Sequence, residues 1–129
     1  MNSGGTMKKS LKVLIVDDEV DLSATLVERL DIRGFDAIAV ETGEQAMKQV
    51  RDNIFDVVVL DIKLKGEDGL DVMKQIKQVN KSLPVILLTG HMSKEANEEG
   101  LKAGAIDYII KPIDIEDLIA KLKEAVALS

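Results

Sequence analysis

The stretch "VVVLDIKLKG", residues 57–66, carries the clearest sign of the fold. It opens with four consecutive apolar residues, a pattern typical of a strand buried on both faces of a parallel sheet. The run ends on a single carboxylate, Asp61, and two lysines and a glycine follow within the stretch. A charge at the end of a buried strand needs partners, and the rest of the chain indicates what they are.

Similar short apolar runs recur along the chain. They are LKVLIV (11–16), FDAIAV (35–40), PVILL (84–88) and IDYII (106–110). Between them, apolar residues recur with the period of amphipathic helices. Segment 93–104 is the weakest of these helices, because Gly100 lies inside it and few of its residues are apolar. The alternation predicts an α/β fold of the (βα)5 type, with helices on both faces of an open parallel sheet.

Composition and charge exclude several functions. The net charge of −6 argues against direct binding of nucleic acid, which favours a basic surface. The absence of cysteine excludes disulfides and thiolate metal sites, and fits a cytoplasmic setting. No apolar run approaches the roughly 20 residues that span a bilayer, so we expect no membrane segment. We expect residues 1–8 to form a flexible leader and residues 9–128 to form one domain.

Polar residues stand where four of the five predicted strands end. Asp17 and Asp18 follow the first strand, Asp61 the third, Thr89 the fourth and Lys111 the fifth. Each has an ordinary explanation when taken alone, such as a helix cap or a solvated loop residue. In open parallel sheets, however, ligands bind beyond the carboxyl ends of the strands. The convergence of these side chains on one edge therefore indicates a functional site.

The residue types at this edge favour phosphoryl chemistry assisted by a metal. Clustered carboxylates repel one another unless a cation joins them. Oxygen ligands without histidine or cysteine favour Mg²⁺, for which Mn²⁺ can substitute. A carboxylate can also attack phosphorus and form an aspartyl phosphate. We therefore expect Asp61 to be the phosphoryl acceptor, Asp17 and Asp18 to hold the metal, and Lys111 and Thr89 to contact the phosphoryl group.

Four segments carry a resemblance to a known family. They are VLIVDDE, VVVLDIKLKGEDGLDVMKQI, PVILLTG and GAIDYIIKP. This set closely resembles the receiver domain of bacterial two-component response regulators, over residues 9–128. The resemblance implies a flavodoxin-like, doubly wound sheet of five parallel strands in the order 2-1-3-4-5. It also implies a phosphorylation-activated signalling switch, which is not an enzyme with an external substrate.

The resemblance assigns a role to each residue around the acceptor. Asp61 receives the phosphoryl group from a phosphohistidine on a histidine kinase or a histidine phosphotransfer protein. Asp18 and Asp61 bind Mg²⁺ directly, together with the backbone carbonyl of Lys63. Asp17 acts on the metal largely through water. These roles are what the family implies for positions that match its motifs.

The resemblance also describes how the site responds. Thr89 and Lys111 contact the phosphoryl oxygens, and the bond between Lys111 and Pro112 is commonly cis in the family. Tyr108, the only tyrosine of the chain, occupies the position of an aromatic switch residue. It turns inward when Thr89 moves toward the phosphoryl group. The change alters the binding of a downstream output domain or protein through helix 93–104, strand 106–110 and the last helix.

Two positions that tune phosphate lifetime in the family hold bulky residues in this chain. They lie two residues after Asp61 and two after Thr89, and are Lys63 and His91. We hypothesise that they crowd out water and slow dephosphorylation, although both could equally be ordinary solvated side chains.

The residues at the strand ends also distinguish the switch from other functions. The main alternative is a phosphate-independent, receiver-like binding platform. An aspartyl-phosphate phosphatase would need an acid where Lys63 stands. A flavin carrier of the same strand order would need a hydroxyl-rich phosphate loop where Asp17 and Asp18 stand. The residues therefore favour the switch over both.

Overall fold

The computed structural model describes residues 10–90 and 94–128, so the predicted leader and His91 lie outside the description. Within these ranges, one parallel sheet contains five strands in the order β2-β1-β3-β6-β7. They are β1 (Lys12–Val16), β2 (Asp36–Val40), β3 (Val57–Asp61), β6 (Val85–Thr89) and β7 (Asp107–Ile110). Numbered as the main strands alone, this is the predicted order 2-1-3-4-5, and the prediction is confirmed.

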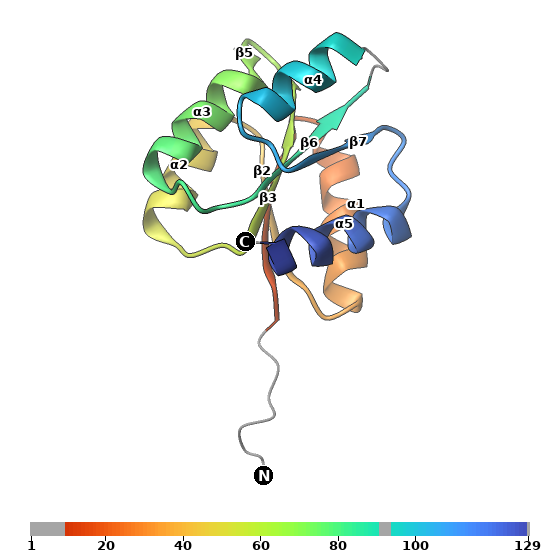
Figure 1. Ribbon diagram of the computed structural model, residues 1–129. Helices are drawn as coiled ribbons and strands as arrows, with labels where there is room; N and C mark the ends of the chain where they lie inside the picture. The colour runs from red at the N-terminus through yellow and green to blue at the C-terminus, as the bar shows by residue number, and fades with distance from the viewer. Residues whose placement is uncertain (1–9, 91–93, 129) are drawn as a thin grey trace.

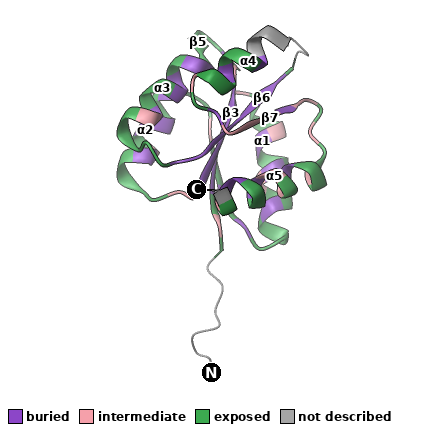
Figure 2. Cartoon of the chain, in the orientation of Figure 1, coloured by how far each residue is buried: buried purple, intermediate pink, exposed green. Residues whose placement is uncertain are grey.

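Helices cover both faces of the sheet. They are α1 (Val20–Ile32), α2 (Gly43–Asp52), α3 (Gly69–Val79), α4 (Lys94–Lys102) and α5 (Ile115–Leu128). Figure 1 shows α1 and α5 on one face and α2, α3 and α4 on the other. Each face has its own apolar cluster, and the central strands β1, β3 and β6 between them are largely buried, as Figure 2 shows. The core therefore fixes the central strands on both sides and holds their carboxyl ends in place.

Two strands run one residue further than their apolar runs suggest. β3 ends at Asp61, which pairs in register with Leu88, and β6 ends at Thr89, which pairs with Ile110. The backbone N–H of Ile62 still donates to the carbonyl of Leu88, at 3.0 Å. The sheet's hydrogen-bond ladder therefore positions the two polar side chains directly.

A small hairpin follows β3 and was not predicted from the sequence. Its strands are β4 (Lys63–Leu64) and β5 (Glu67–Asp68). Gly66 allows the turn with φ +70°, a conformation that favours glycine. The N–H of Gly69 closes the loop by donating to the carbonyl of Ile62 at 2.7 Å. A Glu67 oxygen also accepts the N–H of Gly43 at 2.9 Å, where α2 begins. The loop beside the acceptor strand is therefore anchored at both ends.

Candidate functional site

The predicted polar residues meet at the carboxyl edge of the sheet. Asp17 directly follows β1 and is 0% exposed, while Asp61 and Thr89 end their strands and are each 5% exposed. Buried polar side chains are normally paired, because an unpaired one loses its interactions with water. A cluster of buried acids at a strand edge therefore depends on a cation.

Lys111 supplies that cation from the residue after β7. Its Nζ lies 2.8 Å from Asp61 Oδ2, 2.7 Å from Glu19 Oε1 and 3.0 Å from Asp17 Oδ2. Its backbone N–H donates to the carbonyl of Thr89 at 2.8 Å, which ties β7 to β6 at this edge. The peptide bond that joins it to Pro112 is cis. One ammonium thus connects three carboxylates from two strand ends.

The pKa values of Lys111 and Asp17 are both raised, but for different reasons. Burial favours the neutral amine of Lys111, but the carboxylates of Asp61, Glu19 and Asp17 outweigh burial and raise the lysine's pKa. For Asp17, burial raises the pKa and outweighs both the hydrogen bond from the Glu19 N–H and the charge of Lys111. The site therefore stabilises the ammonium form of Lys111, whereas burial opposes the charged form of Asp17.

Glu19 is a member of the cluster that sequence reasoning missed. Its carboxylate and those of Asp17 and Asp61 offer oxygens that all lie within 4.8 Å of one another. Its position two residues after Asp17 was the available signal, since both side chains leave the same loop. Its side chain is 59% exposed, so it forms the solvent side of the cluster.

Asp18 and Lys63 face the hairpin in this structure. Asp18 Oδ2 accepts the backbone N–H of Lys65 at 2.6 Å, and Asp18 is half-buried. The N–H of Lys63 donates to Asp61 Oδ1 at 2.8 Å, while the Lys63 side chain is exposed. Two backbone N–H groups of the hairpin segment therefore bond to carboxylates at this edge, one to Asp18 and one to Asp61.

The donor set fits a hard divalent cation. Asp17 Oδ2 is buried and accepts no hydrogen bond from the described residues, although the Lys111 ammonium lies within ion-pair distance. Such an oxygen has lone pairs that a cation or its bound water can use. Together with Asp61, Asp17 could hold Mg²⁺ at the edge of the sheet.

Comparison with known proteins identifies the family. The model of the response regulator receiver domain family matches residues 13–123. The chain belongs to this family. The chain is 37% identical over 118 residues to the transcriptional regulatory protein ZraR of Escherichia coli. This match covers 92% of the chain and 27% of ZraR. The chain is also 38% identical over 112 residues to the two-component response regulator PhoP of Pseudomonas aeruginosa, with coverage of 87% and 50%.

Solved structures agree with this assignment. The receiver domain of the Francisella response regulator 1452 superposes with a TM-score of 0.86 at 30% identity, covering 92% of this chain and 98% of that one. NtrX from Brucella abortus superposes with a TM-score of 0.87 at 30% identity, covering 92% of this chain and 27% of the NtrX chain. This receiver domain thus spans about a quarter of the length of ZraR and of NtrX, and half of PhoP. Family membership favours a signalling domain over a phosphatase or a flavin carrier.

The described residues contain no helix that is both long enough and apolar enough to cross a membrane.

Proposed function

We propose that this receiver domain is a switch that is activated by phosphorylation of Asp61. The phosphoryl group moves from a phosphohistidine nitrogen to an Asp61 oxygen, so that the N–P bond breaks and an O–P bond forms. The donor is a histidine kinase or a histidine phosphotransfer protein. The observation that carries the proposal is the Lys111 ammonium, 2.8 Å from Asp61 Oδ2. It can neutralise charge on the acceptor and on the arriving phosphoryl oxygens.

The acidic residues would hold Mg²⁺ in this function. Asp17, Asp18 and Asp61 would supply oxygens, with the backbone carbonyl of Lys63, and Asp17 would act largely through water. When bound, the ion would neutralise negative charge at the phosphoryl group. The buried Asp17 Oδ2 supports this role, because it has lone pairs left beside its ion pair with Lys111 at 3.0 Å.

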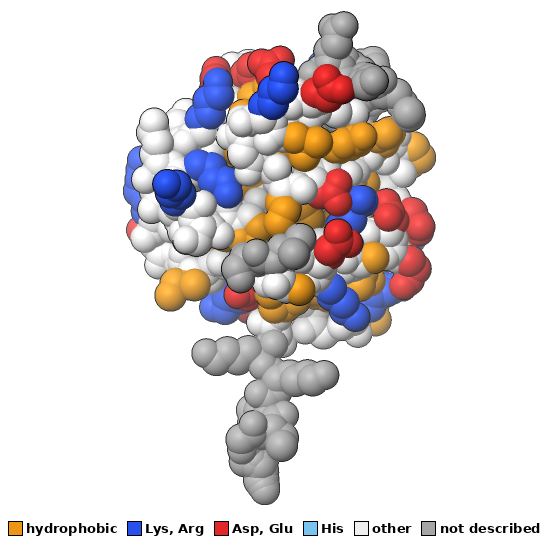
Figure 3. Space-filling view, viewed as in Figure 1, with side chains coloured by type: hydrophobic (Ala, Val, Ile, Leu, Met, Phe, Trp, Pro, Cys, Tyr) orange, Lys and Arg blue, Asp and Glu red, His pale blue; other side chains and the backbone are white. Residues whose placement is uncertain are grey.

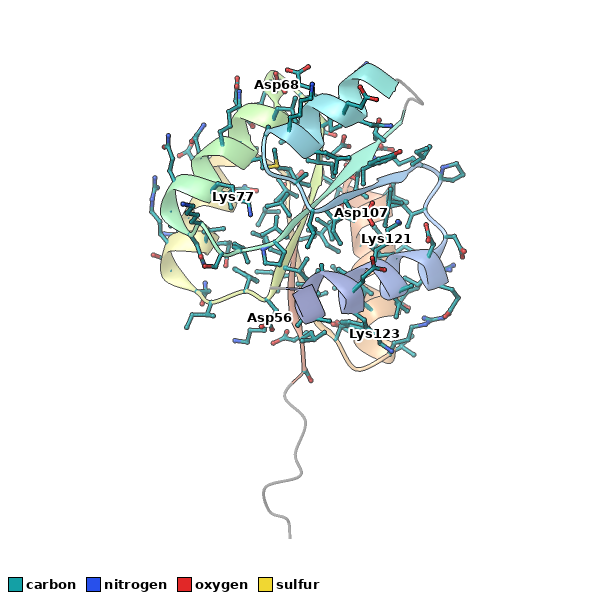
Figure 4. All side chains as sticks on the ribbon, viewed as in Figure 1. Asp56, Asp68, Lys77, Asp107, Lys121 and Lys123 are labelled. Atoms are coloured by element: carbon teal, nitrogen blue, oxygen red, sulfur yellow. The ribbon has the colours of Figure 1, made fainter. Side chains whose placement is uncertain are left out.

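The signal would leave through the face formed by α4, β7 and α5. Tyr108 is half-buried on β7, and Leu101 of α4 is 41% exposed. Figure 3 shows hydrophobic side chains gathered in a band across this region. At its α5 side, Lys121 and Asp107 form an ion pair of 2.9 Å, and the labelled side chains point toward each other in Figure 4. An apolar band beside charged groups suits a downstream output domain or protein.

The test is phosphorylation by a small donor. The protein is incubated with Mg²⁺ and acetyl phosphate, and its intact mass is recorded. We expect the gain of one phosphoryl group, and no gain in Asp61→Asn. Asp56→Asn is the matched control, because Asp56 precedes β3 at the opposite end and bonds to the Lys12 N–H. It should still gain the group.

Two outcomes would count against the switch. A gain that persists in Asp61→Asn would mean that another residue is the acceptor. A folded wild-type protein that gains nothing would favour the phosphate-independent binding platform.

Phosphate lifetime gives a second test of the same site. Lys63 is the first residue of the hairpin. Its backbone N–H donates to Asp61 Oδ1, and its side chain is exposed. If it shields the aspartyl phosphate from water, Lys63→Ala should speed dephosphorylation severalfold, as measured by loss of the phosphorylated mass with time. Lys65→Ala is the control, because it removes an exposed lysine two positions away and keeps the N–H that bonds Asp18. Equal rates in wild type and Lys63→Ala would reject the shielding hypothesis.

A further inference from the structure

Helix α4 carries a buried polar group that has no hydrogen-bond partner among the described residues. Asn97 is only 6% exposed, and its Oδ1 accepts no hydrogen bond from any described residue. Buried amide oxygens are nearly always paired, because an unpaired one has lost its hydrogen bonds to water without replacement. The packing of α4 seen here therefore contains an acceptor that any suitable donor would stabilise.

Gly100 shows which way this acceptor faces. A Cβ added to Gly100 would clash with Leu87 Cδ1 of β6 and would also contact Leu70 Cδ2 of α3. Asn97 precedes Gly100 by three positions, so both lie on the same side of the helix. Because α4 begins after the carboxyl end of β6 and returns over the sheet, Asn97 lies nearer that edge than Gly100 does.

Tyr108 lies in the same layer. It is the register partner of Leu87, and paired residues of neighbouring parallel strands point to the same face. It packs against the apolar cluster that contains Leu70 and Leu87. Thr89 follows Leu87 by two residues and so points to the same face, at the edge of the sheet. Asn97, Tyr108 and Thr89 thus share the layer between α4 and the sheet.

We propose that Asn97 is a positioning residue that holds Tyr108 in the activated form. When the ring turns inward beneath α4, the Asn97 Oδ1 accepts a hydrogen bond from the tyrosine hydroxyl. The acceptor has no partner among the described residues in the present arrangement and gains one in the activated arrangement, so it shifts the equilibrium toward activation. The inference rests on the proposed function, together with the response of Thr89 and Tyr108 to phosphorylation of Asp61 that the family resemblance implies.

A double-mutant cycle tests this pairing. Isothermal titration calorimetry measures the affinity for beryllium fluoride, a phosphoryl mimic, in the presence of Mg²⁺. The variants are Asn97→Leu, Tyr108→Phe and the double variant. Asn97→Leu removes the unpaired oxygen, so it should raise the melting temperature of the ligand-free protein. It should also weaken binding of the mimic by about tenfold, the factor for one hydrogen bond. In the Tyr108→Phe background the same change should weaken binding less than about twofold.

Controls separate this role from packing. Glu98→Leu places the same side chain at the next, exposed position of α4 and should leave binding unchanged. If the leucine variant does not fold, the same double-mutant cycle is measured with Asn97→Ala in its place. Equal weakening in the two Tyr108 backgrounds, or none in either, would overturn the inference while leaving the proposed function intact. A folded wild-type protein that does not bind the mimic would overturn both.

Discussion

Replacing Lys111 with methionine is expected to lower the free energy of unfolding by about 3 kcal/mol at pH 7. The lysine Nζ lies within 3.0 Å of Asp17 Oδ2 and closer to Asp61 and Glu19, and Asp17 is 0% exposed. Methionine keeps most of the volume but removes the charge. The variant therefore leaves buried carboxylates facing one another without a cation.

The loss should depend on pH with a defined sign. Burial already raises the pKa of Asp17, and the loss of Lys111 raises it further. The folded variant then binds protons more readily than the unfolded chain, so its stability recovers as pH falls through the folded pKa. In the wild-type protein the Lys111 pKa is raised above its usual 10.5, so the stabilisation by the lysine is complete below that pH and is lost only at higher pH.

Urea unfolding at pH 7 and pH 5 measures both effects. Lys121→Met is the matched control, because Lys121 pairs with the partly exposed Asp107 at 2.9 Å. Such a pair contributes at most about 1 kcal/mol. Equal losses in the two variants, or a Lys111→Met deficit that grows in acid, would contradict this account of the site.

Replacing Gly69 with alanine is expected to cost about 3 kcal/mol of folding free energy, at the upper end for overpacking. An added Cβ would clash with the carbonyl oxygen of Asp61 and with Ile62 Cα and O, all of which are backbone atoms. Backbone at the end of a buried strand cannot move aside as a flexible side chain can. The variant should therefore also displace Asp61 and reduce phosphorylation by acetyl phosphate.

Gly90→Ala is the control for this substitution. Gly90 follows β6 at the same edge, but a Cβ there would meet no atom of the described residues within 4 Å, its chain neighbours aside. The stability of Gly90→Ala should therefore change by less than about 0.5 kcal/mol. Urea unfolding of both variants makes the comparison. A Gly69→Ala protein as stable as Gly90→Ala would show that the α3 start is looser than its packing indicates.

Much of the fold was predictable because it follows from local patterns. Strands buried on both faces need continuous apolar runs, and helices that cover them need an apolar stripe. The ends of those runs placed Asp17, Asp61, Thr89 and Lys111 at one edge before any contact was known. Strand order came from the resemblance to a family, because crossover connections do not reveal which strands are neighbours.

Contacts between distant residues were not predictable in the same way. Glu19 joins the cluster because Lys111, 92 positions away, reaches it. Asp18 faces the hairpin because the Lys65 N–H, 47 positions away, is there to bond it. The hairpin itself has strands of two residues, too short to produce an alternating pattern.

The sequence by itself determined where the chemistry lies, since periodicity and residue type select the strands and the acids at their ends. Only the tertiary structure decided which carboxylates contact the Lys111 ammonium. It also decided which buried polar atoms have no hydrogen-bond partner among the described residues. Gly100 illustrates the difference. In the sequence it predicts a weak helix, whereas in the fold it lets α4 pack against Leu87 and brings Asn97 into the buried layer. The reason is physical: propensity depends on neighbours in the chain, but burial and pairing depend on neighbours in space.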